Sequence, residues 1–135
     1  MASYNKFNTL VADLANKVHN LGSDQLKVAL TNSAPVATNT VLANITEVSY
    51  TNCSTRNVTL TSSSQSSGLY KLIVVDLTLT ASGTVGPFRY IVLYNSTAAS
   101  GPLIAWWDYG SNLTLANGDT LLLDFDQSNG VFQLT

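Results

Sequence analysis

The sequence predicts a mostly β fold, an antiparallel β-sandwich or barrel with one N-terminal α-helix. Short segments with strand-like patterns follow one another at fairly regular spacing, which is typical of sandwiches and barrels. Ser, Thr and Asn supply most of the polar positions, and these residue types suit strands and turns. One helical pattern precedes the strands. We expect the 135 residues to form a single domain, residues 1–135, with a core of its own.

The helical pattern covers residues 7–21. Apolar residues recur there at intervals of three and four and form one stripe, which is typical of a helix that packs on a core. They are Phe7, Leu10, Val11, Leu14, Val18 and Leu21. Gly22 follows the stripe and suits a C-terminal cap. We expect this helix to cover one face of the sheet.

A strand is expected at residues 25–31, followed by a long loop at residues 32–44. The loop contains Pro35, is rich in Ser, Thr and Asn, and exceeds the usual length of connections within compact domains. Two interpretations remain open. The loop is either an arm that reaches a neighbouring subunit or an ordered excursion over the chain's own surface.

The remaining strands are expected where apolar residues alternate or run together, at residues 56–62, 69–80, 88–95, 103–109, 120–126 and 131–134. The Ser-rich residues 63–68 are expected to form a turn or loop. Asn117-Gly118 and Asn129-Gly130 are typical of type I′ turns, in which both central residues have positive φ, so each pair predicts a β-hairpin.

The strands at residues 88–95 and 103–109 carry apolar side chains at consecutive positions, so both faces of their sheet are expected to be covered. Trp106 and Trp107 are adjacent and must point to opposite faces. One of them therefore points inward. The other lies under the helix or against another chain, where Trp is a typical interface anchor.

Three tyrosines are candidates for ligand binding. Tyr90, Tyr94 and Tyr109 would form a carbohydrate-stacking platform if they shared an outer face. The alternative is that they pack in the core or in a contact between subunits. The sequence favours this alternative.

Charged residues make up only 10% of the chain, and the formal net charge is −2. The basic residues are scattered, so they form no phosphate-binding patch and nucleic acid is not an expected partner. No apolar run is long enough to span a membrane, and the N-terminus lacks a signal-peptide pattern, so we expect synthesis in the cytoplasm and no membrane partner. The weak charge suits a protein that sits permanently against neighbours.

Two acidic residues and one thiol are candidate chemical sites. Asp124 and Asp126 lie on one face of an expected strand, but the Gly and Glu that an EF-hand calcium loop requires are missing from the residues that follow. No metal site is therefore expected. The single cysteine, Cys53, lies in a polar run without a His or carboxylate motif, so we expect no reactive thiol and no intramolecular disulfide.

The sequence offers no catalytic signature. His19 is the only histidine, and near a helix C-terminus its cation would be favourable without any catalytic role. Asp76 and Asp108 are the best candidates for a glycosidase carboxylate pair, because each follows an apolar strand segment. No nucleophile motif accompanies them. We expect a protein that is not an enzyme and binds no cofactor.

Several stretches are distinctive: the opening MASYNKF, the helical residues 7–20, the loop APVATN at residues 34–39, GPFRY and VLYN within residues 86–95, and WWDYG at residues 106–110. In these stretches and in overall pattern, the chain resembles small virion structural proteins of tailed bacteriophages. The resemblance spans most of the chain and includes no catalytic motif.

The resemblance implies a capsid decoration or cement protein on the capsid surface of the virion, made in the host bacterial cytoplasm. Such a protein binds the major capsid protein where capsid subunits meet, as a homo-oligomer with a trimer as the expected form. The N-terminal segment or the 32–44 loop would be the reaching arm. The candidate interface residues are Tyr4, Phe7, Pro35, Tyr90, Tyr94, Trp106 and Trp107. The alternative is a tail or tail-fibre component that binds host glycans through Tyr and Trp.

Overall fold

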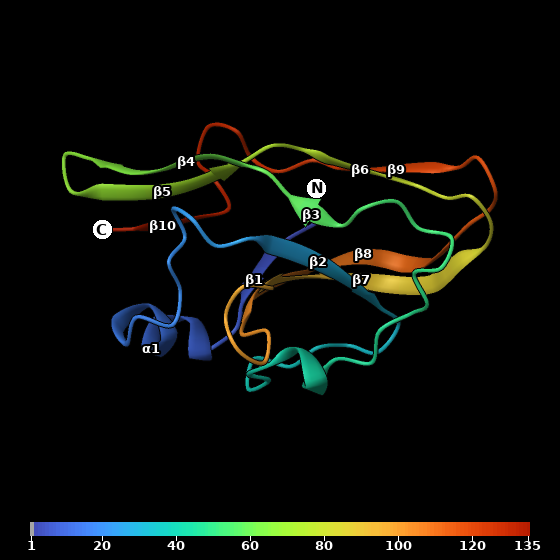
Figure 1. Cartoon of the computed structure of the whole chain (residues 1–135), viewed down its shortest axis with the longest axis horizontal. Coiled ribbons are helices and arrows are strands. Elements are labelled where there is room, and N and C mark those ends of the chain that lie inside the picture. The colour runs from blue at the N-terminus through green and yellow to red at the C-terminus, as the bar shows by residue number, and fades with distance from the viewer. Residues whose placement is uncertain (1) are drawn as a thin grey trace.

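The structure is a computed structural model that describes residues 2–135. It confirms a mostly β fold, with 48% strand and 7% helix, in which antiparallel sheets pack as a sandwich around one core (Figure 1). A single short α-helix, α1 (Thr9–Ala15), lies near the N-terminus. None of the helices within residues 2–135 is both long and apolar enough to cross a membrane.

The first layer is a five-stranded antiparallel sheet. Its strands lie in the order β1 (Tyr4–Lys6), β8 (Leu103–Leu115), β7 (Val85–Asn95), β2 (Leu26–Thr31) and β3 (Asn57–Val58). The sequence prediction of strands at β2, β7 and β8 is confirmed, because their apolar runs are buried on both faces.

The second layer consists of two smaller sheets that lie end to end over the first layer (Figure 1). One has the strand order β10 (Phe132–Leu134), β5 (Leu69–Val74) and β4 (Leu60–Ser66). The other pairs β6 (Leu77–Thr80) with β9 (Thr120–Leu123). Side chains from both layers, such as Leu72 and Leu79 above and Leu30 and Leu93 below, form the main core.

The predicted helix over residues 7–21 is much too long. The chain leaves the helix after Ala15, because Lys17 adopts a left-handed conformation with φ of 65°. The N–H of Val18 donates to Asp13 O at 2.9 Å and that of Lys17 to Leu14 O at 3.4 Å, which is the pattern of a Schellman stop. Gly22 is therefore not the helix cap.

The early stop splits the apolar stripe that predicted the helix. Phe7, Leu10 and Leu21 are buried, but Val11 is 52% exposed and Val18 is 37% exposed. Leu10 joins the main core. The outer face of the five-stranded sheet has a different cover. Its buried residues all come from outside the helix: Phe7, Ala29, Ile45, Val92, Tyr94 and Leu103.

The long loop after β2 forms this cover. Residues 32–44 include the short 3₁₀ helix η1 (Leu42–Asn44) and run across the outer face of the sheet. Backbone hydrogen bonds attach the loop to its own chain: the Leu103 N–H donates to Thr40 O at 3.0 Å and the Leu42 N–H to Gly101 O at 2.9 Å. Within this chain, the loop is an ordered excursion.

Two predicted strands are divided differently in the structure. Residues 56–62 contribute to both β3 and β4, and the Ser-rich residues 63–66, predicted as turn or loop, continue β4. Residues 69–80 form β5 and β6 with a break between them. The break lies at Asp76, whose carboxylate accepts hydrogen bonds from the Phe125 N–H at 2.8 Å and from Gln127 Nε2 at 3.0 Å.

The two Asn-Gly pairs form turns, with Gly118 at φ 89° and Gly130 at φ 80°, but neither joins two paired strands. β8 pairs with β1 and β7, β9 pairs with β6, and β10 pairs with β5. The predicted hairpins are therefore wrong. Each turn passes the chain from one sheet to another, and the predicted strand over residues 120–126 ends at Leu123.

Candidate functional site

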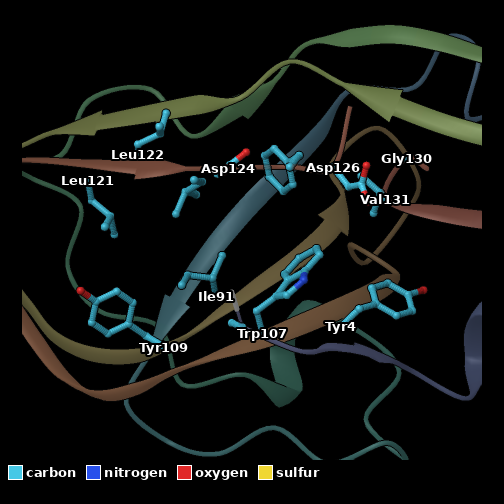
Figure 2. A pocket seen from close by; sticks show the side chains of 13 residues that line it. Tyr4, Ile91, Trp107, Tyr109, Leu121, Leu122, Asp124, Asp126, Gly130 and Val131 are labelled. Carbon is cyan, nitrogen blue, oxygen red and sulfur yellow. The ribbon is translucent and has the colours of Figure 1, made fainter. Parts of the chain in front are cut away.

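An aromatic pocket of about 470 Å³ opens between the two layers. We define the aromatic pocket by Tyr4, Trp107, Tyr109 and Phe125, with Asp124 and Asp126 at its rim. Figure 2 shows Trp107 standing between Tyr4 and Tyr109 on one side of the opening, with Leu121 and Asp124 on the other. Its wall is otherwise aliphatic, and none of its lining residues is basic.

Strand alternation and pairing build the aromatic wall. Trp107 and Tyr109 are two positions apart in β8 and therefore share a face. Tyr4 of β1 lies opposite Trp107 in the sheet register. The Tyr4 and Phe125 rings each meet the Trp107 ring edge to face, with centroid distances of 5.9 Å. Such pairs are favourable, so the indole is held in a defined orientation.

The hydroxyl of Tyr4 stays neutral at physiological pH. Burial of the side chain raises the pKa of Tyr4 to about 12, because the phenolate would lose hydration. Tyr4 is nevertheless 38% exposed, so its hydroxyl remains accessible as both donor and acceptor at the edge of the aromatic pocket.

The two rim carboxylates differ in what they can offer a ligand. Asp126 Oδ1 accepts hydrogen bonds from the N–H groups of Ser128 and Asn129, each at 2.8 Å, and Oδ2 accepts one from Asn129 Nδ2 at 3.0 Å. These bonds hold the pKa of Asp126 below its ordinary value. The Asp126 carboxylate is thus engaged in its own turn, while that of Asp124 is exposed and points away from Trp107 (Figure 2).

Between Ala2 and Thr135, no three or more His, Cys, Asp and Glu side chains gather in a way that could hold a metal ion. Asp124 and Asp126 both line the aromatic pocket, but they are not part of such a group. The thiol of Cys53 is half-buried, and burial raises its pKa, which lowers its reactivity.

The carboxylates considered for glycoside hydrolysis are both occupied. Asp76 holds the break between β5 and β6 through the hydrogen bonds described above. Asp108 forms a bidentate ion pair with Arg89, with Nε to Oδ1 at 2.8 Å and Nη2 to Oδ2 at 3.0 Å, and it also accepts the Gly110 N–H. The guanidinium of Arg89 and the Gly110 N–H lower the pKa of Asp108. Neither residue lines the aromatic pocket.

His19 belongs to a buried polar cluster rather than to the helix terminus. Its side chain is fully buried, its Nδ1 lies 3.0 Å from Asn95 Nδ2, and its Nε2 lies 4.0 Å from an Asp13 carboxylate oxygen. Asn95 Nδ2 also contacts Asp24 at 2.6 Å. Burial lowers the pKa of His19, while the charges of Asp13 and Asp24 act in the opposite direction. No pattern in the sequence indicates that Asn95 and Asp24 meet this histidine.

The structure separates the predicted interface residues into two groups. Tyr4 and Trp107 line the aromatic pocket. Phe7, Pro35 and Tyr94 are buried within the single chain and expose almost no surface to a partner. Two residues fall between these cases: Trp106 is half-buried against Phe7, with ring centroids 4.6 Å apart, and Tyr90 is half-buried beside Arg89.

Tyr90, Tyr94 and Tyr109 do not share one outer face, so the tyrosine platform that the sequence left open does not form. Tyr94 packs in the cluster on the outer face of the five-stranded sheet, whereas Tyr109 faces the aromatic pocket on the inner face. The aromatic surface that does exist combines Tyr4, Trp107 and Tyr109 with Phe125. Phe125 was not predicted as a site residue, because its position depends on the pairing of β6 with β9. No protein-family model, curated protein or solved structure matches the chain.

Proposed function

We propose that the protein is a non-enzymatic structural protein of a bacteriophage virion, which decorates the capsid as a homo-oligomer and binds the major capsid protein across neighbouring subunits. The resemblance of its sequence to small virion proteins and its low content of charge support this role. The hydrogen bonds that occupy Asp76 and Asp108 support the absence of catalysis. The added contact area across capsid joints would stabilise the shell against the pressure of packaged DNA.

One observation carries the binding role. An apolar groove of about 400 Å³ lies between α1 and β10, beside β1, and we call it the α1–β10 groove. Val11 and Leu134 line it and are 52% and 43% exposed, and Leu14 of α1 also lines it. Lys6 is its only charged lining residue. Exposed apolar side chains gathered in one groove are typical of protein interaction sites.

Substitutions in the α1–β10 groove test the binding role. We expect Val11→Glu combined with Leu134→Glu to weaken binding to capsids that lack the protein by about tenfold or more, because each carboxylate would be buried without a partner. Both side chains face solvent in the free protein, so its thermal unfolding should change little. Binding would be measured by co-sedimentation with such capsids.

The matched control is Val36→Glu. Val36 is 53% exposed and lies in the 32–44 loop, outside the groove. Unchanged binding of this variant locates the contact in the groove. A loss confined to Val36→Glu would instead locate it in the loop, as the reaching-arm interpretation expects. If both variants bind normally, the proposed contact is wrong.

Copy number tests the location in the virion. Quantitative mass spectrometry of purified virions measures the number of copies of this chain per particle. We expect that number to be a simple fraction of the number of major capsid proteins. A copy number that matches the tail or its fibres would reject the decoration role.

The aromatic pocket favours a second candidate, a tail or tail-fibre module that binds host glycans. Trp107 and Tyr4 offer aromatic faces, and the hydroxyls of Tyr4 and Tyr109 offer hydrogen bonds at the rim. Aromatic faces and polar rims together suit sugar rings. Titration with oligosaccharides from the host surface should change the Trp fluorescence, and Trp107→Ala should abolish the change while Trp106→Phe retains it.

A further inference from the structure

The outer edge of β4 is an unprotected strand edge. β4 pairs with β5 on one side, and among residues 2–135 no strand pairs with it on the other. Figure 1 shows β4 and β5 extending as a hairpin at one end of the molecule, with β4 on the side of β5 away from β10. All seven residues of β4 are exposed or half-buried.

The other outer strands are all shorter than β4. β3 has two residues, β1 and β10 have three each, with Lys6 in β1, and β6 and β9, which pair only with each other, have four each. Short length and lysine both discourage the addition of another strand. β4 has seven residues and neither Pro nor charge, and its single irregularity lies at its start, between Leu60 and Ser62.

The chemistry of β4 points to a specific partner. No charged residue occurs from Asn57 to Tyr70, and the β4 sequence is LTSSSQS. Two copies of a strand that carries charge would place like charges across a two-fold axis, whereas β4 places small hydroxyl groups opposite one another. Ser and Thr pairs across neighbouring strands are compatible with close approach and can exchange hydrogen bonds.

We propose that β4 pairs antiparallel with β4 of a second copy of this chain, about a two-fold axis near Ser63 or Ser64. The pairing joins two three-stranded sheets into one six-stranded sheet. The two copies contribute the same surface to this contact, so it closes as a dimer. This inference deepens the self-association that the proposed function includes, and it replaces the expected trimer with a two-fold contact.

Ser62 and Ser64 allow the contact to be disrupted without damage to the monomer. Their hydroxyls lie 2.9 Å apart on one face of β4, and Ser64 lies opposite Lys71 of β5. In Ser62→Glu with Ser64→Glu, the carboxylate at position 64 can pair with Lys71 within the chain. Across the two-fold axis, either register places two introduced carboxylates opposite each other.

The experiment is sedimentation equilibrium of the full chain over a wide range of concentrations. We expect the wild-type protein to approach about 29 kDa, twice the 14.4 kDa of one chain. The Ser62→Glu, Ser64→Glu variant should remain at the mass of one chain, and its thermal unfolding should match that of the wild type at concentrations where the wild type is monomeric. A control with the same added charge on exposed positions of β8 and β9, Thr114→Glu with Thr120→Glu, should dimerise like the wild type.

A charge-reversed partner sharpens the test. Ser62→Lys with Ser64→Lys should be monomeric alone, and an equimolar mixture with the glutamate variant should recover the dimer. A wild-type protein that is monomeric throughout, a trimer, or a dimer indifferent to both variants would overturn the inference. Capsid binding by a monomeric wild type would leave the proposed function standing while the β4 contact fails. If the glutamate variant then also lost capsid binding, β4 would accept a capsid strand instead.

Discussion

Trp106 and Trp107 are neighbours in β8, yet the two faces of the sheet on which they lie are built differently. On the Trp106 face, the indole packs on the fully buried ring of Phe7, and Leu42 from the 32–44 loop and Ile45 directly after it complete the cover. On the Trp107 face, the indole meets Phe125 and Tyr4, but the aromatic pocket remains open beside it.

The difference follows from what covers each face. The Trp106 face is closed by Phe7 and by the 32–44 loop, and backbone hydrogen bonds attach this loop to β8 and to the residues before it. The Trp107 face is covered by two separate small sheets. The strand structure is interrupted between them, at Asp76. The outer face thus contributes mainly to stability, whereas the inner face leaves an accessible aromatic surface that can serve binding.

The largest expected effect is on the closed face. Phe7→Ala removes a fully buried ring and leaves a cavity between Trp106 and the loop, so we expect a loss of about 3–5 kcal/mol in the free energy of unfolding. Urea denaturation followed by circular dichroism would measure it. A loss below about 1 kcal/mol would show that the loop does not seal this face.

Trp107→Ala should lower the free energy of unfolding by less, about 2 kcal/mol, because the side chain is half-buried and one side of it already borders the aromatic pocket. The same denaturation experiment compares the two variants directly. If Trp107→Ala proves as destabilising as Phe7→Ala, the two faces are equally closed and the distinction between them is wrong.

The break between the two small sheets depends on Asp76. Asp76→Ala leaves the Phe125 N–H without its acceptor and removes one acceptor of the Gln127 side-chain amide. We therefore expect a loss of about 1–2 kcal/mol in the free energy of unfolding. Asp108→Asn is the control, because it changes a carboxylate in an ion pair at the surface and should alter the unfolding midpoint little. Equal effects of both substitutions would contradict a special role for Asp76.

Local patterns predicted the elements that depend on local burial. The consecutive apolar residues of β7 and β8 indicate burial on both faces, and the alternation at β2 indicates a strand; all three exist. The helix end was missed because Lys17 occupies a left-handed position where Gly is usual, so the stop leaves no mark in the sequence.

Long-range pairing was not predictable in the same way. Asn117-Gly118 signals a turn, but it does not say whether the strands on either side pair with each other, and here they belong to different sheets. The candidate site shows the same limit. Trp107 and Tyr4 are among the candidate interface residues that the sequence suggests, whereas Phe125 joins them only because β9 pairs with β6.

The smallest expected effect is a pH dependence from the cluster that ties the segment after α1 to the end of β7. Asn95 Oδ1 accepts the N–H groups of Thr97 and Ala98, so its Nδ2 donates to His19 Nδ1. Protonation would turn Nδ1 into a second donor facing Nδ2. Asp13 and Asp24 favour the imidazolium, but burial outweighs them and the pKa of His19 lies below its ordinary value of 6.5.

The unfolded chain therefore takes up the proton before the folded protein does. The contribution of His19 to stability is complete above the unfolded pKa, falls as the pH drops from there toward the folded pKa, and stays lost below it. Denaturation from about pH 8 to about pH 5 should show a steeper loss for the wild type than for His19→Gln, which cannot titrate but keeps an acceptor for Asn95. If stability falls with pH equally in the two proteins, the folded protein accommodates protonated His19 without loss. The Asp13 carboxylate, 4.0 Å from His19 Nε2, would then accept its added charge.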